Sequence, residues 1–181
     1  MYLLTETASP FALERWAAFF ANFGQFAKGF FYTLGISIGA LIVALLLGLI
    51  FGAMSSTHNK VLRGISRVYV EIFQNTPLLV QFVVVFYGIS ILTDGHVMIP
   101  ISLTAILCVG VYTGAYISEI IRTGIEAVPK GQTEAALSQG FTYADTMRII
   151  ILPQAVRTIL PPLTNQVVNL IKNTSTVAII S

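Results

Sequence analysis

The chain has 181 residues, of which 55% are hydrophobic and only 10% are charged, and its mean hydropathy is +0.81. A soluble domain of average composition carries about 25% charged residues, so this sequence has too few charges to cover a water-exposed surface. A soluble enzyme is therefore excluded, and the formal net charge of +2 is too small to indicate nucleic-acid binding.

Long uncharged runs predict an all-α, polytopic membrane helix bundle that forms a single domain over residues 1–181. A helix needs about 20 mainly apolar residues to cross roughly 30 Å of hydrocarbon. The last run is the weakest, because it contains two prolines, several amides and a lysine. The four predicted spans are 30–55, 72–93, 97–118 and a segment that begins near Thr158.

The segment 1–28 precedes the first span, and the stretch 10–32 is rich in Phe and contains Trp16. Aromatic rings favour the headgroup region of a bilayer. This composition is typical of an external, interfacial helix that leads into the first span. Alternatively, this stretch is simply the frayed start of the first span.

Basic residues predict the orientation of the spans. Lys60, Arg63 and Arg67 lie between the first two spans, whereas the loop between the second and third spans has no Lys or Arg. More basic residues follow the third span, within 122–157. The positive-inside rule therefore places 56–67 and 122–157 in the cytoplasm and the N-terminus outside.

Small residues recur at helical spacing inside the predicted spans. Such pairs let two helix backbones approach closely in lipid, where van der Waals packing drives association. They predict close helix packing in the bundle, at Gly35/Gly39, Gly48/Gly52 and Gly110/Gly114.

The cytoplasmic segment 122–157 has mixed composition and clear helix boundaries. A short helix is predicted from Thr133, with Glu134 in its first turn, where a carboxylate complements the helix dipole. Gly140 suits the position just past the end of this helix. Thr142 and Asp145 resemble a capping box that opens a second helix, which we expect Pro153 to stop.

The order Glu134-Ala135-Ala136, Gly140 and Ile-Ile-Leu-Pro at 150–153 resembles the EAA loop of type I ABC importer permeases. The flanking stretches resemble the polar amino-acid permease branch of that family, and the resemblance covers roughly residues 26–181. Those stretches are NTPLLVQ (75–81), AYISEIIR (115–122), VPKGQTEAA (128–136), LPQAVRTILPPLTNQ (152–166) and LIKNTS (170–175).

The sequence departs from the family pattern in two places. Gln74 stands where many relatives have Arg before the Asn/Gly-Thr-Pro motif. The branch usually has five spans, and the sequence stops at Ser181, where a final span would be expected.

The resemblance implies a permease subunit of an ATP-driven importer for a polar amino acid, in the inner membrane of a bacterium. It also implies three partners: a dimer of ATP-binding subunits, a second permease chain that is identical or related, and an external amino-acid-binding protein. The sequence has no G-x-x-x-x-G-K-[ST] phosphate loop, so ATP would be bound by the partner and this chain would be neither an enzyme nor cofactor-dependent. The residues implied in coupling to the ATPase are Glu134, Ala135, Ala136, Gly140, Leu152 and Pro153; for Glu134, simple stabilisation of its own helix is the alternative.

Candidate substrate-path residues come from the last two spans. Asn165, Asn169 and Lys172 are spaced i, i+4 and i+7, so they share one helix face, which should look into the bundle or a water-filled cavity. Glu119 could bind an ammonium group, but an i, i+3 ion pair with Arg122 is an equally good interpretation. Pro77 and the pair Pro161-Pro162 are expected to break helices at membrane depth.

Two other functions are open on the sequence. A gradient-driven secondary transporter would need carboxylates at mid-membrane, but Glu71 and Glu119 lie near the ends of spans. The second alternative function is that of a truncated membrane scaffold that transports nothing. His58 and His96 are isolated, Cys108 has no nearby base, and no catalytic or metal-ligand spacing is apparent.

Overall fold

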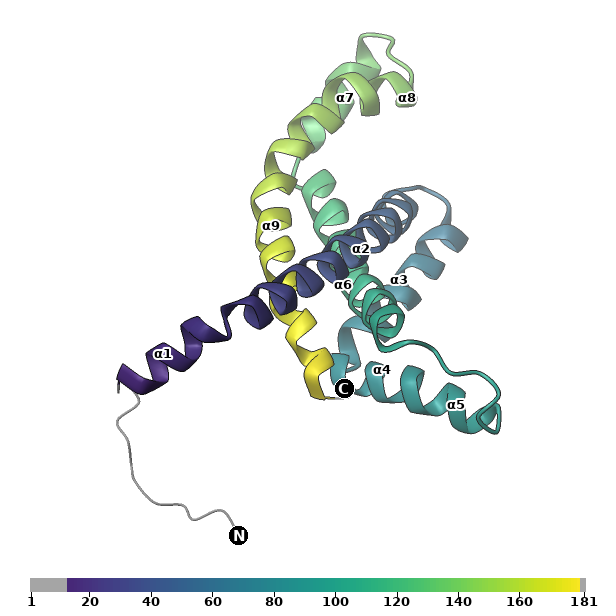
Figure 1. Cartoon of the computed structure of the whole chain (residues 1–181). Coiled ribbons are helices and arrows are strands. Elements are labelled where there is room, and N and C mark those ends of the chain that lie inside the picture. Colours follow the sequence, from purple (N-terminus) through teal and green to yellow (C-terminus); the bar gives the residue numbers. More distant parts are fainter. Residues whose placement is uncertain (1–12, 180–181) are drawn as a thin grey trace.

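A computed structural model describes residues 13–179, and within that range every regular element is a helix (Figure 1). This confirms the all-α prediction. The elements are α1 (Leu13–Ala21), α2 (Phe23–Ser55), α3 (Lys60–Asn75), α4 (Leu78–Val83), a π-helical turn (Val84–Gly88), α5 (Ile89–Leu92), α6 (Ile101–Glu126), α7 (Lys130–Ser138), α8 (Tyr143–Asp145), a π-helical segment (Thr146–Ile151), α9 (Leu152–Asn173) and a 3-10 segment (Thr174–Ile179).

The centre of the bundle is the contact between α2 and α6. Ala40 and Ala44 of α2 and Ala105 and Val109 of α6 are completely buried. Small side chains at these positions let the two backbones approach closely, which maximises van der Waals contact without help from water exclusion.

The glycine pairs confirm the predicted close packing within the chain. A Cβ atom added to Gly52 would lie 2.8 Å from Cβ of Ile121, and one added to Gly110 would lie 2.7 Å from Cβ of Val43. Gly35 differs from the other five glycines, because a Cβ there would meet no atom within 4 Å. The other five glycines therefore let α2 and α6 pack closely, while Gly35 is exposed and has no neighbour in contact with it.

The predicted span 72–93 is not one helix. Pro77 has an extended backbone and forces Thr76 out of the helical region (φ −99°, ψ 122°), so the chain bends by 98° between α3 and the α4–α5 helix. Gln81 stabilises the bend, because its side-chain amide donates to the carbonyls of Phe73 (3.1 Å) and Thr76 (3.0 Å).

The structure supports fewer membrane spans than the four predicted. By length and composition, α2 and α6 can cross a membrane, and the bent pair of α3 with α4–α5 is a third candidate, among the residues that the structure describes. The predicted fourth span corresponds to α9, which does not meet the same hydropathy criterion. Four spans are therefore not established by the helices themselves.

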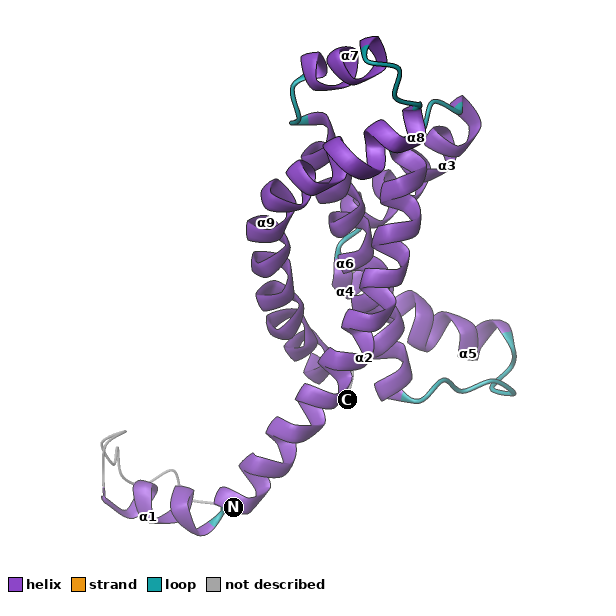
Figure 2. Ribbon diagram, turned by 90° about the horizontal axis from the view of Figure 1, so that it is seen from above, coloured by secondary structure: helices purple, strands orange, loops and turns teal. Residues whose placement is uncertain are grey.

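The helix α9 is continuous through Pro161 and Pro162, so the prediction of a break there is wrong. A proline fixes φ near −65°, which a helix tolerates, but its ring and missing N–H bend the helix locally. Figure 2 shows α9 bowed around the bundle rather than interrupted.

The N-terminal helix α1 is separated from α2 at Asn22, whose side-chain amide donates to the carbonyl of Ala18 (2.8 Å). Together with the first turns of α2, α1 extends away from the bundle (Figure 1). Trp16 and Phe20 are largely exposed, which suits the predicted interfacial helix. Residues 1–12 of the predicted external segment lie outside the described residues.

Candidate functional site

The predicted cytoplasmic segment 122–157 begins inside α6 and ends inside α9, so its loop is shorter than expected. The helix α7 begins at Lys130, directly after Pro129, whose backbone is extended (φ −56°, ψ 133°). Because α7 starts three residues before the predicted Thr133, Glu134 lies in the second turn and not in the first. The helix dipole therefore gives its carboxylate little support.

The end of α7 agrees with the prediction for Gly140, which has a φ of +88°. The amide of Gly140 donates to the carbonyl of Leu137 (3.0 Å), and the amide of Phe141 donates to that of Ala136 (3.2 Å). These two bonds form a Schellman motif, which needs a left-handed residue that glycine adopts without steric cost. The turn after α7 is therefore defined by local hydrogen bonds.

The next helix starts at the predicted capping box. The hydroxyl of Thr142 accepts from the amide of Asp145 (3.2 Å) and donates to the Asp145 carboxylate (2.6 Å). Pro153 does not stop this helix, contrary to prediction. The chain widens into a π-helix over Thr146–Ile151 and continues directly into α9, because a π-helical turn accommodates the proline near the start of α9.

We define residues 130–153 as the coupling element. Glu134 and Ala135 are exposed on α7, and Glu134 also lines the groove between this element and the bundle, whereas Ala136 is buried where α7 packs against the π-helical segment. Leu152 and Pro153 are exposed at the start of α9. Two apolar side chains of the coupling element are also exposed, Leu137 in α7 and Phe141 in the turn after it. The sequence analysis missed them because an isolated apolar residue carries no periodic signal.

A groove of about 680 Å³ separates the coupling element from the ends of α2 and α6. His58, in the loop between α2 and α3, contacts the ring of Tyr143 edge-on, with 5.1 Å between ring centroids. The Thr146 hydroxyl lines the groove, is buried and has no hydrogen-bond partner in the described structure. The coupling element thus contacts the bundle partly through one aromatic pair, which no spacing in the sequence indicated.

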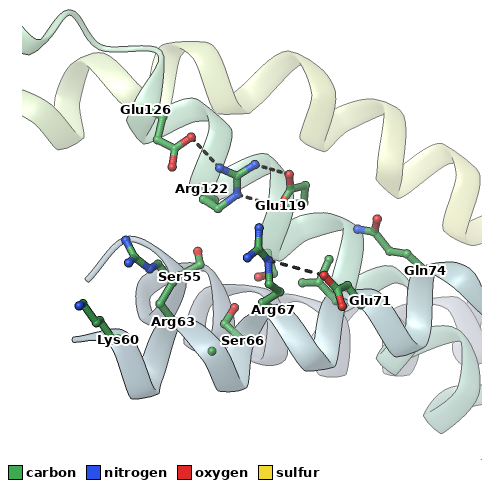
Figure 3. A pocket seen from close by; sticks show the side chains of 13 residues that line it. Ser55, Lys60, Arg63, Ser66, Arg67, Glu71, Gln74, Glu119, Arg122 and Glu126 are labelled. Atoms are coloured by element: carbon green, nitrogen blue, oxygen red, sulfur yellow. Dashed lines mark hydrogen bonds and ion pairs between the residues drawn. The ribbon is translucent and has the colours of Figure 1, made fainter. Parts of the chain in front are cut away.

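A second groove, of about 660 Å³, runs between α3 and α6 and carries seven charged side chains (Figure 3). Each ion pair in it joins residues of the same helix. The charged residues are Lys60, Arg63, Arg67 and Glu71 on α3 and Glu119, Arg122 and Glu126 on α6.

Glu119 is a member of this groove, and its carboxylate accepts from Nε of Arg122 at 2.9 Å. The ion-pair interpretation of Glu119 is therefore confirmed. Asn165, Asn169 and Lys172 are exposed along α9 and do not line this groove, so the structure does not bring them together with Glu119.

The fold and these sites define a helical membrane protein in which the exposed coupling element lies at one end of the central helices. Residues 44–181 match the family described as "Binding-protein-dependent transport system inner membrane component", and the chain belongs to this family.

Two curated relatives are amino-acid transport proteins by name. The chain is 41% identical over 165 residues to the "Probable glutamine ABC transporter permease protein GlnM" of Bacillus subtilis (strain 168), covering 90% of the chain and 74% of that protein. It is 36% identical over 162 residues to the "Glutamate/aspartate import permease protein GltJ" of Escherichia coli (strain K12), covering 84% of the chain and 66% of that protein. The chain thus spans about two thirds to three quarters of these relatives.

Solved structures agree with this family. A chain of "Crystal structure of an amino acid ABC transporter with histidines" superposes with a TM-score of 0.83 at 34% identity, covering 91% of this chain and 75% of that one. A chain of the MetNI methionine ABC transporter in an inward-facing conformation has a TM-score of 0.68 at 18% identity, covering 86% of this chain and 74% of that one. The second likeness shows the fold alone.

Proposed function

We propose that this chain is the permease subunit of an ATP-driven importer for a polar amino acid and that residues 130–153 couple it to separate ATPase subunits. The observation that carries the proposal is the shape of the coupling element. It presents Glu134 and Ala135 to solvent, and it passes without a break into α9. The names of the relatives supply the class of solute.

Coupling follows from the mechanics of this arrangement. A partner that binds α7 moves a short helix whose C-terminal end is capped at Gly140 and which is followed at once by the capped start of α8 at Thr142. The motion passes to α9 through the helical segment and to the bundle through the His58–Tyr143 contact. Two sites count as coupled only when both bias the same structural element, and α9 would be that element here.

The translocation path would be completed by a second permease chain. Asn165, Asn169 and Lys172 form an exposed polar stripe on α9. Amides and an ammonium group facing hydrocarbon are costly, so this stripe should face water or another protein chain. Two copies placed with these stripes toward each other would enclose a path whose donors and acceptors suit an amino-acid zwitterion.

The proposed orientation puts the coupling element in the cytoplasm of a bacterial cell and the N-terminus outside its inner membrane. Lys60 and Arg63 at the start of α3 lie at the same end of the bundle as the coupling element, whereas α1 lies at the opposite end of α2 (Figure 2). The positive-inside rule supports this orientation. A binding protein would then deliver the solute to the outer end.

The proposal is tested by replacing Glu134 with Arg in the complete transporter, reconstituted in proteoliposomes. Loss of solute uptake at least tenfold below the parent, with the chain still inserted, is expected because the substitution places a cation in the docking face. Asp94→Arg is the matched control, since Asp94 lies in the loop between α5 and α6. Unchanged uptake and ATP hydrolysis in the Glu134→Arg complex would refute the coupling role.

A further inference from the structure

Two tyrosines lie one turn apart near the middle of α6. The hydroxyl oxygens of Tyr112 and Tyr116 are 3.1 Å apart, and their ring centroids are 5.0 Å apart. At 1.5 Å per residue, they lie about 17 Å and 23 Å along a helix of about 39 Å. Tyrosine in membrane proteins usually lies at the headgroup level, where its hydroxyl meets water. Two half-buried phenols at mid-helix therefore need a polar neighbour.

One hydroxyl hydrogen of these two residues, which we call the tyrosine pair, has no acceptor among the described residues. Two phenol hydroxyls carry two hydrogens, and the contact between them uses one, whichever oxygen is the donor. An unused O–H in hydrocarbon costs free energy, because no water is there to accept from it. The tyrosine pair can therefore donate one more hydrogen bond.

The tyrosine pair points away from α2. Gly110 faces α2, because a Cβ there would lie 2.7 Å from Cβ of Val43. Gly114 faces α2 as well, with 3.1 Å from an added Cβ to Cβ of Leu47. Each tyrosine follows one of these glycines by two residues, which turn a helix by about 200°. The pair therefore lies on the side of α6 opposite α2.

The polar stripe of α9 lies on the same side of the bundle as the tyrosine pair. The helix α6 leads into the coupling element and α9 leads back from it, so the two run antiparallel, and they meet where a Cβ on Gly124 would overlap Ile159 (Figure 1). Tyr116 lies eight residues before Gly124, about 80° beyond two full turns. Asn169 lies ten residues after Ile159, about 80° short of three full turns. Both are turned from the contact in the same sense, which in antiparallel helices places them on one side.

The tyrosine pair also continues into the charged groove between α3 and α6. Glu119 follows Tyr112 at i+7 and Tyr116 at i+3, so it lies on the same stripe, and it lines the groove (Figure 3). Its carboxylate accepts from Nε of Arg122 at 2.9 Å. Because that charge is neutralised by its partner, the stripe can accommodate an anionic group.

We propose that the tyrosine pair donates its free hydrogen to the carboxylate of the amino acid that passes through the permease. A hydrogen bond to a charged acceptor is stronger than one between neutral groups, which favours the carboxylate over the neutral groups of the solute. The amide oxygen of Asn169, on the same side, would accept from the ammonium group. This inference rests on the proposed function and adds two residues of α6 to the translocation path.

A first test asks whether the pair faces water, and it does not depend on which solute is carried. In the complete transporter in nanodiscs, Tyr116→Cys should react with a sulfonate-bearing methanethiosulfonate reagent at least tenfold faster than Ile42→Cys, an exposed apolar position on α2. The parent, whose Cys108 is buried, gives the background. Equal rates at both positions would place the pair against lipid or another protein chain and would overturn the proposal.

A second test measures binding to the complex of permease and ATPase subunits, without the binding protein. Each common L-amino acid, labelled, is titrated in turn, and the one that binds most tightly is compared with the amine left when its carboxylate is removed. Tyr112→Phe/Tyr116→Phe should raise the Kd of the amino acid about tenfold and leave that of the amine unchanged. Tyr87→Phe makes the same chemical change outside α6 and should keep the parent Kd.

The outcomes separate this inference from the function on which it rests. A parent-like Kd in the double variant, or an equal loss for the amino acid and its amine, would refute the role of the tyrosine pair alone. Binding of no amino acid by the parent complex would refute the proposed solute class, and this inference with it.

Discussion

The backbone amide of Leu152 donates to the carbonyl of Met147, five residues earlier in the chain. This bond closes the π-helical segment and joins the coupling element to α9 without a turn. The element is therefore the end of a bundle helix, and a displacement of α7 reaches α9 along one continuous helical path.

Breaking that path should separate docking from transport. Insertion of two glycines after Ile151 should leave ATPase-subunit binding intact while lowering uptake per ATP hydrolysed at least tenfold, because the linker bends before it transmits force. The measurement is the ratio of transported solute to phosphate released in proteoliposomes. The same insertion between Val97 and Met98, in the loop before α6, is the control; parent-like coupling in the Ile151 insertion would argue against transmission along α9.

Gly140 should be required for the shape of the coupling element. Its φ of +88° costs an L-residue about 1 to 2 kcal/mol. Gly140→Ala should therefore raise the dissociation constant for the ATPase subunit about tenfold, measured by titration in detergent.

Gly131 provides the matched control for that substitution. It lies inside α7, and a Cβ there would meet no atom within 4 Å. Gly131→Ala should leave binding unchanged and stabilise α7 by about 1 kcal/mol. An equal loss of binding at both positions would show that the effect is unrelated to the backbone conformation of Gly140.

Gly110 should be required for the packing of α2 against α6. A Cβ there would lie 2.7 Å from Cβ of Val43 and 3.1 Å from the carbonyl oxygen of Ala40. Gly110→Val should destabilise the chain by about 2 kcal/mol through overpacking, seen as a lower Tm in detergent. Gly35→Val, which meets no atom within 4 Å, should change the Tm less. A similar drop in both variants would mean that helix propensity, and not the α2–α6 contact, is responsible.

Lys172 should affect solute binding rather than the stability of the fold, because its side chain is exposed on α9. Loss of one charge-assisted hydrogen bond to a carboxylate is expected to raise the KM for uptake about tenfold in Lys172→Ala, with the Tm unchanged. Lys28→Ala, near the start of α2, is the control and should keep the parent KM. Parent kinetics in the Lys172 variant would give this residue a structural role.

The sequence by itself determined the features whose causes lie within a few residues or in composition. Low charge and long apolar runs identified a membrane bundle, Gly140 identified a helix end, and Thr142 with Asp145 identified a helix start. Each depends on local sterics, on hydrogen bonds between near neighbours, or on the transfer of side chains into lipid. The Glu119–Arg122 pair belongs to the same group, because both residues lie on one helix.

Only the tertiary structure decided whether a helix continues through a proline and which distant parts of the chain come into contact. Pro77 breaks its helix while Pro153 and Pro161 do not, since the outcome depends on whether neighbouring groups such as the Gln81 amide compensate the freed carbonyls. The His58–Tyr143 contact joins two residues far apart in the chain, and the charged groove brings side chains of α3 beside those of α6. These contacts depend on how the helices pack in three dimensions, and no local pattern encodes them.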